Sequence, residues 1–280
     1  MNIFEAVEFG KNQLFEKNIA NPKNETEKII EHILEVDKIF ILLNQNLEIS
    51  KNQLLKLKSF ISRRGSGEPL EYILEKVSFY SEQFFIKKGA LIPRPETEIL
   101  IDKAIEILKG FKNSKVLEIG VGSGVVSIML AKLVPNISIV AIDISEKALK
   151  IAQQNIRLFQ VADKIELIQS DLFEKVDNLN KFDLIISNPP YISKSEKGKL
   201  QKELDFEPEI ALYGGTIGDE ILQKLVVNFF KNHNIKYLVC EMGYDQKQMI
   251  EDFVKNRGKL DFYQDLANFD RGFILEKHLN

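Results

Sequence analysis

Short apolar segments alternate with amphipathic segments from Pro93 onward, and this alternation constrains the fold more than any other feature of the chain. Alternating strands and helices at this spacing are typical of a doubly wound, mostly parallel sheet. We therefore predict an α/β fold for this part, with ligands bound at the carboxyl ends of the strands. Strands are expected at 115–119, 138–142, 165–168, 182–187, 237–240, 260–263 and 272–275.

The chain before Pro93 differs in character and predicts two further parts. Residues 1–64 carry apolar positions at helical spacing, which indicates a small helical domain. Residues 65–92 contain many turn residues followed by two short β-prone runs, which indicates a linker with a β-hairpin. The expected organisation is a helical domain at 1–64, a linker at 65–92 and a larger α/β domain at 93–280.

One helix of the first domain has a one-sided charge. It is expected to begin after Ser50, where Gln53 completes a capping box, and to end at Arg64. Between Lys51 and Arg64 five residues are basic and none is acidic. A solvated helix face and a docking surface for an acidic partner both explain this run, and the sequence leaves the choice open.

Composition excludes several classes of protein. The chain has 38 basic and 41 acidic residues, so it lacks the strong positive field that non-specific binding to nucleic acid requires. No apolar run approaches the roughly 20 residues of a membrane helix, and Glu5 and Glu8 stand where a signal peptide would be basic. A single cysteine, Cys240, excludes an internal disulfide and fits a reducing compartment. We therefore expect a cytoplasmic protein. No metal is expected, because metal-ligand spacing is absent among His32, His233 and His278.

A glycine-rich loop follows the first strand of the α/β part, and it supplies five candidate cofactor-binding residues. These are Gly120, Val121, Gly122, Ser123 and Gly124. Glycines let the backbone approach a ligand closely, and the start of the next helix presents free N–H groups. The spacing matches neither the dinucleotide pattern nor the phosphate loop. It suits S-adenosylmethionine, whose amino-acid part has no pyrophosphate; a purely structural tight turn is the alternative.

Two acidic residues follow the next two strands. Asp143 can accept hydrogen bonds from both ribose hydroxyls of a nucleoside, as acids at this place do in related sheets. Capping of the following helix, to which Ser145 also contributes, is the alternative. Asp171 and the backbone of Leu172 are candidates for contacts with the adenine edge.

The most specific motif is Asn188-Pro189-Pro190-Tyr191, which follows the apolar strand at 182–187. Two hydrogen-bond acceptors, the Asn188 side-chain oxygen and the Pro189 carbonyl, would hold a planar NH2 group for methylation, and Tyr191 would stack on it. We assign substrate binding to all four residues and catalysis to Asn188, Pro189 and Tyr191, and we expect Asn188 to reach the cofactor as well. Adenine, cytosine and glutamine all present a planar NH2 group, so the motif alone leaves the acceptor open.

Further motifs, taken with the two above, give the chain a resemblance to the HemK-type release-factor glutamine methyltransferases of bacteria. They include Leu91-Ile-Pro-Arg-Pro-Glu-Thr-Glu98, Phe206-Glu-Pro208 and Asp270-Arg271. The resemblance implies a Rossmann-like class I methyltransferase sheet with a small N-terminal helical domain joined by a hairpin. It also implies transfer of a methyl group from S-adenosylmethionine to the glutamine of the GGQ loop in class I peptide chain release factors.

Alternatives and departures accompany this resemblance. The same chemistry could serve glutamine methylation of a ribosomal protein or, less favoured by the charge balance, adenine methylation of DNA. We expect a monomer that binds release factors and neither nucleic acid nor membrane. The chain departs from the usual family residues, often glycine, aspartate or histidine, at Glu75, Ser81, Ile217 and Met242.

Overall fold

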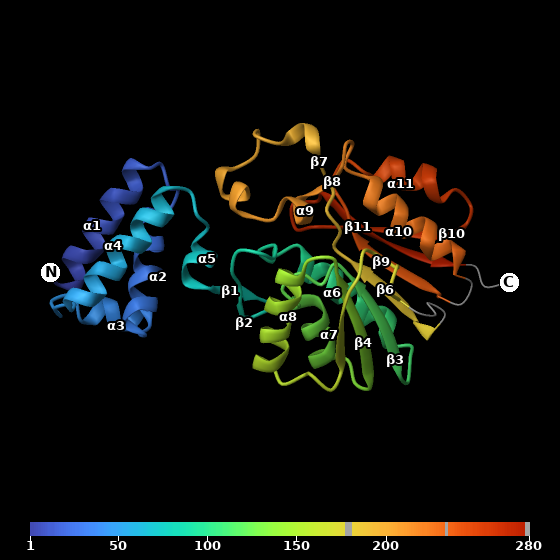
Figure 1. The fold of residues 1–280 in the computed structure, drawn as a ribbon, viewed down its shortest axis with the longest axis horizontal. Coiled ribbons are helices and arrows are strands. Elements are labelled where there is room, and N and C mark those ends of the chain that lie inside the picture. Colours follow the sequence, from blue (N-terminus) through green and yellow to red (C-terminus); the bar gives the residue numbers. More distant parts are fainter. Residues whose placement is uncertain (177–180, 233–234, 278–280) are drawn as a thin grey trace. The chain divides into compact units, whose positions relative to one another are not determined.

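The structure is a computed structural model that describes residues 1–176, 181–232 and 235–277 (Figure 1). His233 and His278 lie outside these ranges. The chain divides into two compact units. One contains Met1–Lys76 and Lys202–Phe206, and the other contains Val77–Gln201 and Glu207–Asn280. Among the described residues, no helix combines the length and apolarity needed to cross a membrane.

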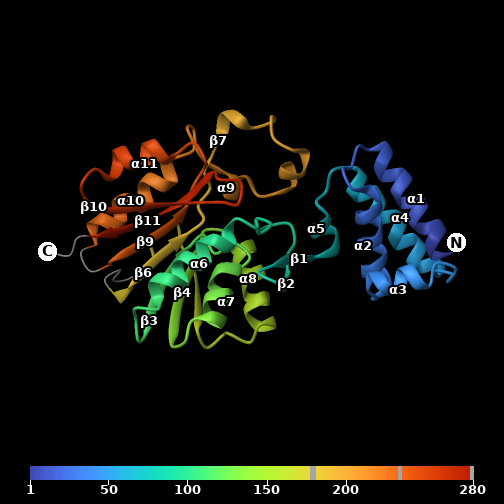
Figure 2. The ribbon, with the colours of Figure 1, turned by 180° about the vertical axis from the view of Figure 1, so that it is seen from behind.

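The first unit is built from helices packed around one apolar core (Figure 2). Capping boxes at Asn2 and Ser50 fix the starts of two of them, because each side chain accepts a hydrogen bond from the first helical turn. The core contains large side chains with no exposed surface, such as Ile3, Leu14 and Ile29. The helices are α1 (Ile3–Glu16), α2 (Pro22–Leu34), α3 (Lys38–Leu43), α4 (Lys51–Gly65) and α5 (Leu70–Leu74).

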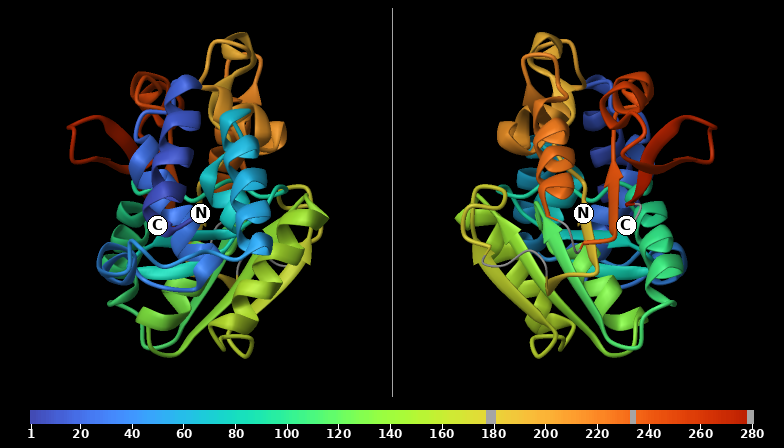
Figure 3. Two further views of the ribbon diagram at one scale, coloured as in Figure 1. Left: turned by 90° about the vertical axis from the view of Figure 1, so that its left-hand side faces the viewer. Right: turned by 90° about the vertical axis from the view of Figure 1, so that its right-hand side faces the viewer.

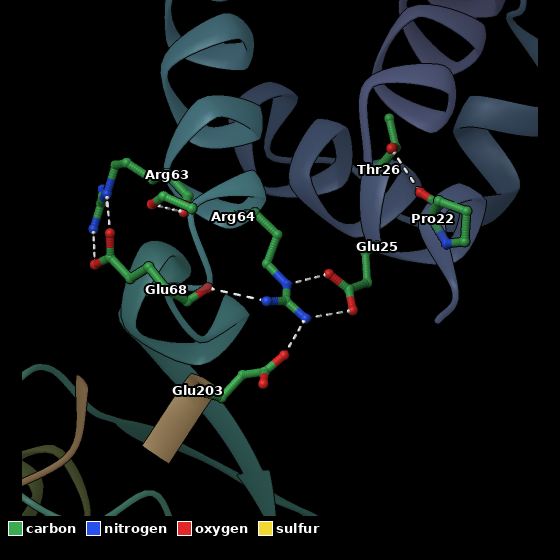
Figure 4. A network of polar contacts seen from close by, with 8 residues as sticks. Pro22, Glu25, Thr26, Arg63, Arg64, Glu68 and Glu203 are labelled. Carbon is green, nitrogen blue, oxygen red and sulfur yellow. Dashed lines mark hydrogen bonds and ion pairs between the residues drawn. The ribbon is translucent and has the colours of Figure 1, made fainter. Parts of the chain in front are cut away.

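The end of α4 is held by ion pairs within this unit (Figure 4). Arg64, whose side chain is 8% exposed, contacts Glu25 at 2.5 Å and Glu203 at 3.1 Å. Arg63 forms a bidentate pair with Glu68. Two of the five basic residues of this helix are therefore paired internally. A docking surface on α4 would depend on the exposed lysines Lys51, Lys56 and Lys58.

The stretch at 65–92, expected to be a linker, contains α5 as well as a two-stranded hairpin of β1 (Lys76–Phe79) and β2 (Glu82–Phe85). Glu75 ends α5 with φ 52°, and Ser81 lies in the hairpin turn with φ 60°. Both are left-handed positions that favour glycine, which explains why a glycine is usual there. The two departures therefore carry local backbone strain.

The second unit contains a seven-stranded sheet, which confirms the predicted fold class. Its order is β10-β11-β9-β6-β3-β4-β5. The five strands from β9 to β5 are parallel, and β11 runs antiparallel to both of its neighbours. The strands are β3 (Ser114–Ile119), β4 (Ile137–Asp143), β5 (Ile165–Gln169), β6 (Leu184–Ser187), β9 (Tyr237–Glu241), β10 (Gly258–Gln264) and β11 (Asp270–Lys277).

Helices cover both faces of this sheet, as the end views show (Figure 3). Leu117 and Ile119 of β3 join one core cluster with the apolar residues of α10 and α11. Glu118 lies between them and points to the opposite face, where Ser127 of α7 donates to it. The helices are α6 (Thr97–Leu108), α7 (Val125–Leu133), α8 (Glu146–Leu158), α9 (Glu209–Leu212), α10 (Glu220–Lys231) and α11 (Lys247–Val254).

Candidate active site

A cavity of about 310 Å³ lies at the carboxyl ends of the parallel strands and is lined entirely by the second unit. This volume is within the range of sites for small organic ligands. Residues that follow β3, β4, β5 and β6 line it, together with the segment before α6 and residues of α9 and α10. The cavity therefore occupies the place at which the alternating pattern predicts a ligand.

The glycine-rich loop forms one wall of this cavity. Gly120, Gly122 and Gly124 have φ values of 79°, 56° and 88°, a region in which residues with a Cβ are strained. A Cβ on Gly122 would meet no other atom within 4 Å, whereas one on Gly124 would lie 3.3 Å from Ala152 of α8. Gly122 thus keeps the wall open, and Gly124 allows two helices to approach each other.

Asp143 joins this loop to the end of β4. Its Oδ2 accepts from the Gly122 N–H at 2.9 Å, and its Oδ1 accepts from the Ser145 N–H at 2.8 Å. Burial raises the pKa of the carboxyl, and these backbone hydrogen bonds oppose the rise. Ser145 itself caps α8. The carboxylate shapes the loop and lines the cavity, and its oxygens have acceptor capacity left for a ligand hydroxyl.

The segment after β5 closes the other side of the cavity. Asp171 and Leu172 both line it, and Leu172 has a φ of 46°. The Ser170 N–H donates to the Asp143 carbonyl at 3.0 Å, which ties this segment to the end of β4. Of the five loop residues, Val121, Ser123 and Gly124 are buried, and the carbonyl of Ser123 accepts from Asn155 at 2.8 Å.

The NPPY segment lies at the carboxyl end of β6. Asn188, Pro189 and Pro190 line the cavity, whereas Tyr191 is not among its lining residues. The Tyr191 hydroxyl donates to Glu241 at 3.2 Å, and the Tyr191 carbonyl accepts from Gln246 at 3.2 Å. Burial raises the pKa of Tyr191, so its hydroxyl remains protonated and can donate. The structure gives the hydroxyl a partner that the stacking interpretation did not include.

Two buried residues that the motif analysis did not assign complete the site. The Asn188 Nδ2 donates to the Thr97 hydroxyl at 3.0 Å, and Thr97 donates to Glu241 at 2.8 Å. Thr97 lies within the Leu91–Glu98 motif, and Glu241 ends the apolar strand β9 beside β6. An acidic residue at the carboxyl end of a buried parallel strand is the signal by which Glu241 could have been found.

The segment before α6 is also held in place by a residue that is far away in the sequence. Glu207 is buried, accepts from the Ile92 N–H at 3.0 Å and pairs with Arg94 at 2.5 Å. Arg94 and Thr97 both line the cavity. The motif at 91–98 and the pair Glu207-Pro208, which are far apart in the sequence, therefore meet at one wall of the site.

Comparison with known proteins agrees with this geometry. A family model described as the methyltransferase small domain matches residues 97–204, and one described as the PrmC N-terminal domain matches residues 5–74. The fold resembles the catalytic domain of hMettl16, with a TM-score of 0.60 at 12% identity over 83% of this chain and 84% of that one.

Two curated relatives carry the same name, release factor glutamine methyltransferase. The protein from Clostridium acetobutylicum is 31% identical over 97% of both chains. The protein from Dictyoglomus turgidum is 45% identical over 76% of both chains. With similarity of this extent along both units, the chain belongs to the release factor glutamine methyltransferase family.

Proposed function

We propose that this chain transfers a methyl group from S-adenosylmethionine to the side-chain amide nitrogen of the glutamine in the GGQ loop of class I release factors. The observation that carries the proposal is the position of Asn188 and Pro189 at the wall of a cavity that also contains the glycine-rich loop. The relatives' name supplies the acceptor class. The same name disfavours a ribosomal protein or DNA as the acceptor.

The cavity residues fit S-adenosylmethionine. When bound, this cofactor supplies a methyl group activated by a positively charged sulfur. The open backbone at Gly122 leaves room beside the loop for its amino-acid part, and Asp143 can accept from the ribose hydroxyls. Asp171 and Leu172 also line the cavity, and in this proposal Asp171 and the backbone of Leu172 contact the adenine edge. We assign cofactor binding to these residues, to the rest of the loop at 120–124 and to Asn188.

The role of Asn188 and Pro189 follows from the electronic structure of an amide. The nitrogen lone pair of a planar NH2 group is delocalised, so the nitrogen is a weak nucleophile. Two acceptors, the Asn188 Oδ1 and the Pro189 carbonyl, orient the two N–H bonds and stabilise the positive charge that develops on nitrogen. A bond from this nitrogen to the methyl carbon would form as the methyl–sulfur bond breaks and leaves a neutral thioether, and the nitrogen would then release one proton to water. In this proposal Tyr191 supports the flat group beside them.

The charge of the molecule suits a protein acceptor. The net charge is −3, so the enzyme is not drawn to the phosphate groups of nucleic acid. An exposed loop of a release factor can be reached without such an attraction. The three exposed lysines of α4 form one group in the first unit that an acidic surface could contact. Because translation takes place in the cytoplasm, we place the enzyme there, acting as a monomer.

The test is methylation of a full-length release factor by purified enzyme with isotope-labelled cofactor, followed by mass spectrometry of the GGQ peptide. We expect one methyl group on the glutamine side chain and no incorporation when that glutamine is replaced in the factor. Asn188→Ala should lower kcat by roughly 100-fold or more, because a preorganised hydrogen-bonding group is lost. Gln154→Ala, on the exposed side of α8, is the matched control. Incorporation into a ribosomal protein or DNA but not into the factor would refute the proposal.

A further inference from the structure

Glu241 is a fully enclosed carboxyl group that the proposed function leaves without a role. It is 2% exposed and ends β9, the strand that lies parallel to β6. Ser187 pairs with Cys240 in this register. Asn188 comes directly after Ser187 and Glu241 directly after Cys240, so the two residues lie at the same level of the sheet on neighbouring strands. An acidic side chain buried beside the candidate catalytic residue needs a physical reason, because burying a charge is costly.

Glu241 accepts two hydrogen bonds, and both lead to the NPPY segment. Its Oε1 accepts from the Tyr191 hydroxyl at 3.2 Å, and its Oε2 accepts from the Thr97 hydroxyl at 2.8 Å. The Thr97 hydroxyl in turn accepts from the Asn188 Nδ2 at 3.0 Å. The Nδ2 side of the Asn188 amide therefore faces the Thr97 hydroxyl, and its Oδ1 lies on the other side of the amide. One carboxylate is thus linked to the side chains at both ends of the motif.

An ionised carboxylate can only accept hydrogen bonds, and this fact sets the direction of the whole chain. Thr97 must use its single hydroxyl proton toward Glu241, so only its lone pairs remain for Asn188. Asn188 must then turn its NH2 toward Thr97, and its carbonyl oxygen is left for the acceptor. A neutral carboxyl would itself donate, which would release the Thr97 proton to bond the Asn188 oxygen.

We propose that Glu241 is a positioning residue whose ionised carboxylate fixes the amide orientation of Asn188, so that Asn188 presents its oxygen and not its NH2 to the acceptor NH2 group. The proposal rests on the proposed function for its consequence in catalysis. The orientation itself depends only on the contacts among Glu241, Thr97 and Asn188. With the reversed orientation two NH2 groups would face each other, and the acceptor nitrogen would lose one of its two hydrogen-bond acceptors.

The surroundings of Glu241 place its ionisation in an accessible pH range. Burial raises the pKa of its carboxyl to about 7, against the lowering effect of the hydrogen bonds from Thr97 and Tyr191. Glu96, at the start of α6, raises it further, and Arg271 of β11 lowers it. The other titratable groups that face it are Tyr263 of β10 and the neighbouring Cys240, both neutral because burial raises their pKa values.

The first experiment needs no methyl acceptor. In protein labelled with ¹⁵N-asparagine, the Asn188 NH2 resonances are identified by their loss in Asn188→Ala. We expect them to titrate with a midpoint near pH 7, because burial raises the pKa of Glu241 to about 7. In Glu241→Gln this titration should disappear, and in Thr97→Val the resonances should shift at every pH. Resonances that do not respond to pH in the unaltered protein would overturn the proposal, whatever the enzyme methylates.

The second experiment measures kcat against pH with a full-length release factor. In the unaltered enzyme kcat should rise with pH through about 7. Glu241→Gln and Thr97→Val should each lower kcat roughly 10- to 100-fold, as loss of orientation does, while cofactor affinity stays within about threefold. Thr97→Ser keeps the hydroxyl and should restore most of the activity.

The matched control is Glu276→Gln. Glu276 also accepts from a tyrosine, Tyr237, at 3.1 Å, but it lies at the opposite end of β11. It should leave kcat and its pH profile unchanged. A Glu241→Gln enzyme that loses only thermal stability and keeps the kcat and pH profile of the unaltered enzyme would show that the carboxyl merely holds α6 against the sheet, and would overturn the proposal.

Discussion

Tyr191 illustrates how a single atom alters the interpretation of a motif. From the sequence, its ring was expected to stack on a flat acceptor group, a role that needs no hydroxyl. In the structure the hydroxyl donates to Glu241, and the ring is half-buried. A hydrogen bond to a charged group contributes about 1.5–3 kcal/mol, more than a bond between neutral partners. The hydroxyl is therefore expected to matter in addition to the ring.

Tyr191→Phe tests this point, because it removes the hydroxyl and keeps the ring. We expect kcat to fall roughly tenfold, in line with the loss of one charge-assisted hydrogen bond. The rise of kcat should also move to higher pH, since this hydrogen bond lowers the pKa of Glu241 and its loss raises it. Kinetic pH profiles measure both effects, with Tyr237→Phe as the control at the other end of β9. An unchanged profile would contradict the coupling to Glu241.

At the scale of elements, the site depends on how β3 passes into α7. Three glycines with positive φ make this turn, and Gly124 begins the helix in the left-handed region. The turn exposes backbone N–H groups, and Asp143 at the end of the next strand accepts from one of them. The loop therefore connects the ends of β3 and β4, and Gly122 and Gly124 are required there for different steric reasons.

A matched pair of substitutions separates these reasons. Gly124→Ala places a methyl group 3.3 Å from Ala152 in a strained conformation, so we expect a loss of roughly 2–3 kcal/mol of stability. Gly122→Ala meets no neighbour and should cost about 1 kcal/mol from backbone strain alone. Its methyl group would instead enter the cofactor's space, so the affinity for S-adenosylmethionine should fall at least about tenfold. Urea unfolding and calorimetric titration measure the two effects, and equal affinities for both variants would contradict the assignment.

At the scale of the whole molecule, buried carboxyls at the site affect how stability depends on pH. Burial raises the pKa of Glu118 to about 8, although Ser127 donates to it, and raises that of Glu241 to about 7. In the unfolded chain both groups have pKa values near 4.5. Between these limits the folded state binds more protons than the unfolded state, so the free energy of unfolding decreases as pH rises.

We therefore expect the melting temperature to fall as the pH is raised from about 5 to 8. Glu118→Gln preserves the shape and the bonds from Ser127 but cannot ionise, so its decline should be shallower. At pH 8 the variant should be the more stable protein, by an amount on the order of 3–4 kcal/mol. Thermal unfolding across this pH range provides the measurement, with the exposed Glu106→Gln as the control. Parallel curves for the variant and the unaltered protein would contradict the shift at Glu118.

The sequence by itself determined the local elements of this protein and the chemistry of its motifs. Apolar periodicity predicts the parallel sheet and the N-terminal helices, and the capping box at Ser50 marks the start of α4. The glycines at 120–124 and the NPPY segment both lie at the strand ends expected for them. These features depend on residues close together in the chain, whose conformational preferences act before any tertiary contact forms.

Only the tertiary structure decided which distant side chains meet. Asn188 contacts Thr97 across 91 positions of the sequence, and Thr97 contacts Glu241 across 144. Arg64 appeared in the sequence as part of a basic face, yet it is buried between Glu25 and Glu203. No local preference encodes such partners, because burial and hydrogen-bond direction arise only when separate strands and helices pack together.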